Sequence, residues 1–283
     1  MLAEKAFFSL TTVTDPANHV AYNRWHQLDH RPENLVLDGV RYGERWVLSP
    51  DCAALSHGTE PELVGTHYVN NYWFREPALV SIAEWQRLAE RSFQWGRRPE
   101  SEWATRPLMG FFSTVKGYAS PRVQVSADAL PFRPNRGVHV TMSRLREPHS
   151  AATARLFAWY DEVRIPDLLE CHGVAGVWTF SSESTTLDPS WEPVPGSTTF
   201  NASGSDQGSI RVTVAFLDED PLDVWSAMEI QARSLSSAGR TRETSDLEST
   251  LFAAPLRAIT PWEWDWFDQS PADVGHNAEH PRR

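Results

Sequence analysis

The sequence predicts an α+β fold in which two tandem βαββαβ units pack their sheets against each other. A helix-and-turn segment in the first half is repeated, without a gap, 134 residues later. The expected order of strands and helices in the first half also recurs in the second. A proline-containing stretch without periodicity, 119–135, separates the halves. These observations indicate an internal duplication, and a hydrophobic content of 41% is sufficient for a packed core.

The repeated segment is also the densest group of polar and aromatic side chains in the chain. Five identities fall within 16 residues, because Trp25, Pro32, Leu35, Gly39 and Val40 recur as Trp159, Pro166, Leu169, Gly173 and Val174. We interpret these shared residues as scaffold that both units need. The residues that differ between the copies are the candidates for function: His26, Asp29 and His30 are replaced by Tyr160, Val163 and Arg164.

The first unit is expected to have four strands and two helices. Aromatic and β-branched residues predict strands, and apolar residues at helical spacing predict helices. Pro32 should disturb the first helix because proline has no N–H to donate. The expected strands are 6–13, 40–48, 66–74 and 109–115, and the expected helices are 17–30 and 77–93.

The second unit repeats this order with a longer loop, 181–208. Pro77 and Pro221 precede equivalent helices and lie 144 residues apart, so the loop has grown by ten residues (144 less 134). The βαββαβ order is that of a ferredoxin-like unit, which leaves one sheet face bare. Two such faces can cover each other, which predicts a pseudo-dimeric α/β barrel. The expected strands are 137–144, 174–180, 210–217 and 251–259, and the expected helices are 151–168 and 221–235.

We expect four segments along the chain: a first unit (1–118), a linker (119–135), a second unit (136–262) and a tail (263–283). The tail begins with aromatic residues that should dock on the protein, and beyond Asp268 its composition is typical of a mobile segment.

Bulk composition narrows the class of protein. A net charge of −11 disfavours binding to nucleic acid and to anionic membranes. No apolar run is long enough to span a membrane, and the first residues do not resemble a signal peptide. Two cysteines do not form a disulfide framework and are typical of a reducing compartment. We therefore expect a cytoplasmic protein.

The first copy of the repeat resembles the EthD-like branch of the dimeric α/β-barrel superfamily in one pattern: Trp25-His26, His30-x-Pro32, then Gly39-Val40 before a strand. The resemblance covers both halves in architecture and residues 22–46 in motif. Members include monooxygenases, isomerases, cyclases, decarboxylases, haem enzymes and proteins of unassigned role, so the resemblance implies the fold more than the reaction. It implies that His30 is the residue to test. Arg164 at the equivalent position does not imply a second site.

His26 and His30 are four residues apart and should share one helix face. One interpretation is acid–base catalysis, with His30 moving the proton and Asp29 or Glu33 orienting it. A second is a divalent metal held by both imidazoles and Glu33. The third is a solvated helix face, with Asp29 paired to an arginine and a histidine at the helix end.

Several other residues are candidates for substrate binding. Arg45 could bind a carboxylate or phenolate, or form an ion pair at a sheet edge. Tyr68 and Tyr72 should share a strand face that lines a cavity, or belong to the core. His67 would join the site if its side chain faces the helix, and Trp25 adds an aromatic surface. His139 should face the barrel interior if the apolar side of its strand meets the helices.

Our main hypothesis is a cofactor-independent lyase, isomerase or cyclase acting on a small hydrophobic or aromatic compound in the barrel cavity. It requires no cofactor and no metal. One alternative is a ligand-binding or accessory protein without catalytic activity, and another is a haem- or metal-dependent oxygenase. The two fused units could form a monomer with internal pseudo-symmetry or pair again as a homodimer.

Overall fold

The computed structural model describes residues 3–98, 103–183, 197–199 and 207–268. In these ranges a ring of antiparallel strands closes in the order β1-β3-β2-β9-β5-β8-β6-β4, with β4 returning to β1, and β7 is added in parallel to β4. The strands are β1 (Lys5–Val13), β2 (Val40–Val47), β3 (Tyr68–Phe74), β4 (Ala104–Ala119), β5 (Gly137–Leu145), β6 (Val174–Ser182), β7 (Ser197–Thr199), β8 (Ile210–Leu217) and β9 (Glu248–Ala258).

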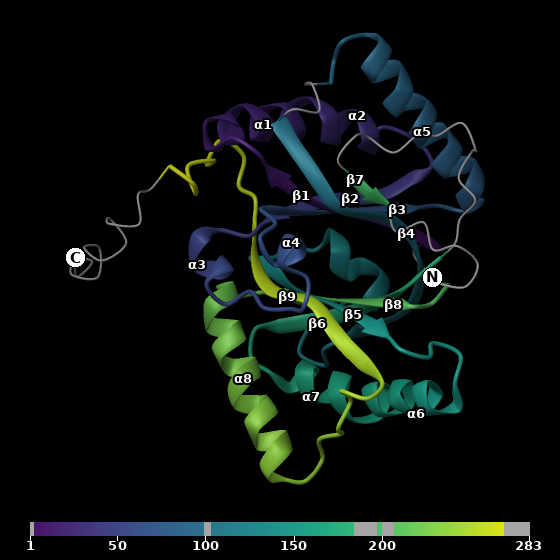
Figure 1. Cartoon of the computed structure of the whole chain (residues 1–283), viewed down its shortest axis with the longest axis vertical. Helices are drawn as coiled ribbons and strands as arrows, with labels where there is room; N and C mark the ends of the chain where they lie inside the picture. Colours follow the sequence, from purple (N-terminus) through teal and green to yellow (C-terminus); the bar gives the residue numbers. More distant parts are fainter. Residues whose placement is uncertain (1–2, 99–102, 184–196, 200–206, 269–283) are drawn as a thin grey trace, which may run out of the picture.

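Helices cover the outer faces of the two sheets, which gives four layers (Figure 1). The first unit carries α1 (His19–Trp25), α2 (Arg31–Leu35) and α5 (Ala78–Gln94). The second carries α6 (Ala151–Trp159), α7 (Ile165–Glu170) and α8 (Pro221–Ser237). Two short helices, α3 (Pro50–Ala53) and α4 (Pro61–Val64), lie in the loop after β2. The predicted fold class, two tandem ferredoxin-like units packed sheet to sheet, is confirmed. Within the described ranges, every helix is too short or too polar to cross a membrane.

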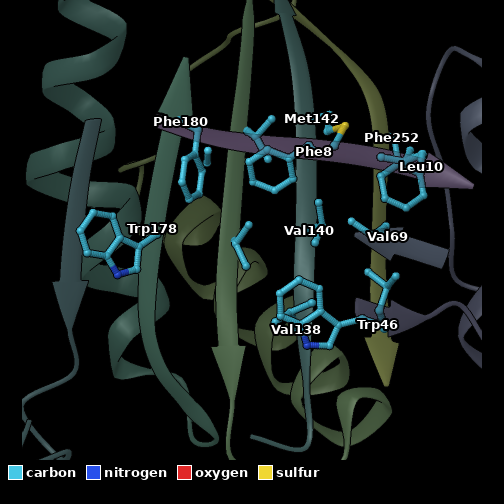
Figure 2. Close-up of a cluster of buried hydrophobic side chains, with 14 of the residues drawn as sticks. Phe8, Leu10, Trp46, Val69, Val138, Val140, Met142, Trp178, Phe180 and Phe252 are labelled. Carbon is cyan, nitrogen blue, oxygen red and sulfur yellow. The ribbon is translucent and has the colours of Figure 1, made fainter. Parts of the chain in front are cut away.

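The space between the sheets is filled with hydrophobic side chains. Phe8 and Leu10 come from a strand that crosses the strands of the second unit, where Val138, Val140 and Met142 face them (Figure 2). All five side chains are inaccessible to solvent. The prediction of a ligand cavity inside the barrel is therefore wrong, because close-packed apolar residues occupy that volume. His139 alternates with these valines, so its side chain lies on the helix side of the sheet.

The disturbance expected at Pro32 takes the form of a π-helical turn, and it is present in both units. In the first unit the turn spans His26–His30 and joins α1 to α2. In the second it spans Tyr160–Arg164. Each turn ends with an N–H bonded to a carbonyl five residues earlier, just before a proline that has no N–H to donate. The chain thus accommodates the proline by widening one turn.

The repeated tryptophan is scaffold in both units. Trp25 donates its indole N–H to the carbonyl of Arg97 (2.8 Å), and Trp159 donates to the carbonyl of Arg240 (3.1 Å). Each acceptor directly follows a glycine with φ of 66° at the end of the long helix. The indole therefore ties the first helix of each unit to the turn after the last.

We expect Trp159→Phe to lower the free energy of unfolding by about 1 kcal/mol, because it removes this hydrogen bond and keeps an aromatic ring. Equilibrium urea unfolding would measure the change. Trp262→Phe is the control, since the Trp262 side chain is largely exposed. Equal losses in the two variants would contradict a specific role for the indole N–H.

Candidate functional site

A pocket lies between the sheet of the first unit and the helices that cover it. Its volume is about 70 Å³. An apolar cavity of roughly 150 Å³ holds benzene, so this pocket encloses only part of a ring-sized ligand. The lining residues come from β1, β3, β4, α1, the π-helical turn and α5 and their neighbours: Phe7, Ser9, Tyr22, Trp25, His26, His30, Asn70, Tyr72, Trp85, Gln86, Ala89, Arg98, Arg106 and Met109.

The π-helical turn places both predicted histidines in the pocket wall. His26 is buried, and its Nδ1 has no hydrogen-bond partner among the described residues. The His30 ring stacks on Trp25, with ring centroids 4.7 Å apart and an interplanar angle of 19°. The two imidazole centroids are 5.1 Å apart. His26, His30 and Trp25 therefore form one continuous surface, as the helical spacing predicted.

Asn34 determines which nitrogen of His30 carries the proton. Its side-chain Nδ2 is 2.6 Å from the carbonyl oxygen of His30 and 3.3 Å from Nε2 of the same residue. A carbonyl only accepts, so the amide N–H₂ faces both atoms. His30 Nε2 then accepts a hydrogen bond, and the neutral ring carries its proton on Nδ1.

Both histidines are neutral at pH 7. Burial lowers the pKa of His26 well below 6.5, and the positive charges of Arg45, Arg106 and Arg31 lower it further. Burial also lowers the pKa of His30 well below 6.5, with added effects of Arg98 and Arg106. A neutral imidazole can accept a proton, which is the property that a general base needs.

Neither candidate carboxylate orients His30. The Asp29 side chain is exposed on the opposite side of the turn from the pocket-lining histidines. Glu33 accepts hydrogen bonds from Ser92 (3.0 Å) and Arg97 (2.7 Å), so it connects α2 to the end of α5. The orienting group expected to be a carboxylate is instead the Asn34 amide. The donor set of the metal hypothesis also fails to assemble: the described residues contain no group of three metal-ligating side chains.

Arg45 is fully buried beneath the pocket wall. It donates to Asn23 Oδ1 (2.6 Å), and its guanidinium lies over the rings of Tyr22 (5.4 Å) and Tyr68 (4.7 Å). Its Nε and Nη1 have no partner among the described residues. The alternative of an edge ion pair is wrong, because β2 lies between β3 and β9 in the ring.

The two tyrosines of β3 have different surroundings. Tyr72 lines the pocket, its hydroxyl has no partner among the described residues, and burial raises its pKa. Tyr68 lies deeper: its hydroxyl is 2.8 Å from Asn23 Nδ2 and 2.9 Å from His19 Nδ1. The two tyrosines therefore share a strand face, as predicted. Of these two, only Tyr72 lies in the described pocket wall.

His67 does not line the pocket. Its Nδ1 accepts the backbone N–H of Val13 (3.0 Å), and its ring packs against Phe267. Phe267 also stacks on His19, with centroids 3.9 Å apart. The aromatic start of the tail thus docks on the first unit, as expected, while residues 269–283 lie outside the described part of the chain.

Sequence reasoning missed the two arginines of the pocket. Arg98 lies in the segment that connects α5 to β4, and Arg106 lies near the start of β4, both outside every motif. It also missed Asn34, although its spacing of four residues from His30 on a helix was a usable signal. No comparable signal was available for Ser9, Trp85 or Gln86, because their contributions depend on long-range pairing.

The second unit has closed the equivalent site with internal pairs. Tyr160, at the position of His26, donates to Glu248 (2.5 Å). Arg164, at the position of His30, pairs with Asp167 (3.3 Å). Thr179 takes the place of Arg45. The unsatisfied polar groups of the first unit therefore have no counterpart at these positions.

A haem does not fit the pocket. A porphyrin has several times more atoms than a cavity of about 70 Å³ can hold. Binding it would require the helices that carry His26 and His30 to separate from the sheet. The described pocket therefore accommodates a small ligand.

Comparison with known proteins identifies the architecture. No protein-family model and no curated protein matches the chain. A crystal structure of a putative chlorite dismutase is similar with a TM-score of 0.50 and 12% identity, over 95% of this chain and 99% of that one. A putative monooxygenase from Fusobacterium nucleatum is similar with a TM-score of 0.49 and 8% identity, over 92% and 94%. An anthrone oxidase-like protein is similar with a TM-score of 0.45 and 11% identity, over 91% and 92%. The chain has the duplicated ferredoxin-like fold of the dimeric α/β barrels.

Proposed function

We propose that this protein is an enzyme that removes a proton from a small phenolic or enolisable aromatic compound, with His26 as the base. One observation carries the proposal. Among the described residues, the buried His26 and the partly buried His30, both neutral, line an aromatic pocket in the first unit, and His26 has an unpartnered nitrogen. Natural proteins leave few buried polar atoms unpaired, so such a group points to a ligand.

Each pocket group has a distinct part in this reaction. His26 takes the proton from an O–H or an acidic C–H, and the substrate becomes an anion. The Tyr72 hydroxyl and the nearby guanidinium groups stabilise the negative charge on its oxygen. His30, with Nδ1 protonated and Nε2 held by Asn34, is a hydrogen-bond donor. Return of the proton from His26 to a different atom completes an isomerisation.

The EthD-like resemblance supports the same site. The motif residues Trp25 and His30 both line the pocket, and His30 was its main candidate. The structure supports His26 as the base instead, because Asn34 already occupies the Nε2 lone pair of His30. His30 becomes a positioning and donor residue in this proposal.

Exchange of carbon-bound substrate hydrogen with D₂O, followed by NMR on a panel of phenols and enolisable aryl ketones, tests the proposal. We expect His26→Asn to slow exchange by about 10²- to 10⁴-fold, the usual contribution of a general base. His139→Asn is the matched control, because His139 is a histidine of the second unit whose pKa is lowered to about 4 by desolvation. Wild-type protein that binds these compounds without exchanging hydrogen would instead indicate a binding protein.

A second candidate is oxygen or oxyanion chemistry. The pocket is small and contains two arginines, which suits an inorganic oxyanion, and the structure with a TM-score of 0.50 is described as a putative chlorite dismutase. An oxygen electrode with either chlorite or the phenolic panel would detect this activity. Oxygen uptake that depends on His26 would identify an oxygenase acting on the substrate anion.

A further inference from the structure

The pocket has an excess of positive charge that the rest of the molecule does not share. The chain holds 37 acidic and 26 basic residues. Nevertheless, the part of the lining that the structure describes contains Arg98 and Arg106 and no carboxylate, and Arg45 lies directly behind it. Other arginines are paired: Arg31 binds Glu44, and Arg97 binds Glu33. Among the described residues, none of the three pocket arginines forms an ion pair.

This arrangement of positive charges is unfavourable by itself. Burial and the charge of Arg106 lower the pKa of Arg98 to about 10. Two partly buried cations repel each other and have lost part of their hydration. A negative charge placed between them would relieve both effects. The second unit shows the usual solution to this problem, because its buried Arg211 lies near the Glu248 carboxylate, which raises the pKa of Arg211 against the effect of burial.

The remaining wall suits a flat ring. Trp25 and Tyr22 lie on one side, and Phe7, Trp85 and Met109 contribute apolar surface from β1, α5 and β4. Aromatic rings in such a wall stack on planar ligands or contact their edges. The pocket encloses only part of a ring of benzene size. The unpartnered indole N–H of Trp85 and side-chain amide nitrogen of Gln86 are further donors.

We propose that the ligand of this pocket is a monocyclic aryl carboxylate, with its carboxylate held by Arg98 and Arg106 and its ring against the aromatic wall. The planar guanidinium group matches a carboxylate, to which it can donate two parallel hydrogen bonds. This inference rests on the proposed function for the location of the site and specifies its substrate class. Burial is the main cause of the lowered pKa of His26, and the arginine charges add to it. An arriving anion offsets those charges, so binding makes His26 a stronger base.

Calorimetric titration with benzoate and with benzamide, which have nearly the same shape, tests the charge requirement. We expect benzoate to bind about 10- to 100-fold more tightly than benzamide, the range for a hydrogen bond to a charged group. Arg98→Gln and Arg106→Gln should each remove most of this difference. Arg233→Gln is the control, because Arg233 is exposed on α8. Equal affinities for the two ligands, or no binding of benzoate at millimolar concentration, would overturn the inference.

Two further measurements separate this inference from the proposed function and from misfolding. His26→Asn should still bind benzoate tightly, so loss of exchange with retained binding leaves the anion subsite intact. Hydrogen exchange that shows no preference for carboxylated substrates would overturn the anion subsite. It would leave the role of His26 as the base unaffected. Without ligand, the Arg98→Gln and Arg106→Gln variants should melt at the wild-type temperature or above, because each substitution removes charge repulsion. A lower melting temperature would contradict the unpaired state of these arginines.

Discussion

Replacing Trp73 with alanine should lower the free energy of unfolding by about 3–5 kcal/mol, the range for removing a buried large aromatic side chain. Trp73 is 1% exposed and comes from β3 in the first sheet. Its ring contacts Trp178 and Phe180 of the second sheet in edge-to-face geometry, with centroids 5.0 and 5.3 Å apart. The substitution therefore opens a cavity between the units and removes contacts that hold them together.

Chemical denaturation followed by circular dichroism measures this loss. Trp95→Ala is the control, because Trp95 is 54% exposed and should change stability by less than about 1 kcal/mol. Combining Trp73→Ala with Trp178→Ala should give a loss smaller than the sum of the two, because the shared ring contact is counted in both. Strictly additive losses would show that the two rings do not interact.

Acid should destabilise the protein steeply between about pH 6.5 and pH 4. The pKa of His139 is lowered to about 4, and those of His26 and His30 lie well below 6.5. Above pH 6.5 these rings are neutral in both states and contribute no pH dependence. Below it the unfolded chain binds protons first, so stability falls by up to about 1.4 kcal/mol per pH unit for each histidine. These three groups give up to about 4 kcal/mol per pH unit, and His19, with a pKa of about 4, and His67, with a pKa lowered by burial, add to the slope.

Denaturation midpoints measured in steps from pH 7.5 to pH 4.5 would give this slope. His139→Gln should reduce the slope by the contribution of one proton, up to about 1.4 kcal/mol per pH unit. The variant has no imidazole at this position to protonate on unfolding. A slope unaffected by His139→Gln would show that this histidine is already protonated in the folded protein at pH 6.

Most of the fold could be predicted from the sequence because both units follow simple periodicities. Strands β2, β6 and β8 differ from the expected ranges by no more than two residues at either end. Strand β4 is longer than its apolar run because Lys116 and Gly117 pair with β6. That pairing connects residues more than 60 positions apart, and local composition carries no information about it. The π-helical turn was foreseen only as a disturbance, because proline shows where hydrogen bonding fails and not how the helix adapts.

The candidate site was predicted in part, and the errors have a common cause. His26, His30, Trp25 and Tyr72 line the pocket because one helix face and one strand face determine them. The role expected of Asp29 was wrong because a spacing of three or four residues does not tell which neighbour points inward through a π-helical turn. The predicted side of the sheet was also wrong: the pocket was expected in the barrel interior and lies on the helix side. Alternation divides β3 into two faces, but both carry aromatic residues, so only the packing partner distinguishes them.

The closure of both sheets within a single polypeptide has an evolutionary consequence. In a two-fold dimer of identical chains, every substitution occurs twice, and a change that helps one half must be tolerated by the other. Here each half carries its own copy of the sequence, so His26 could remain on one side while Tyr160 and Glu248 formed a hydrogen-bonded pair on the other. The fused chain can thus keep one half for chemistry and adapt the other for stability.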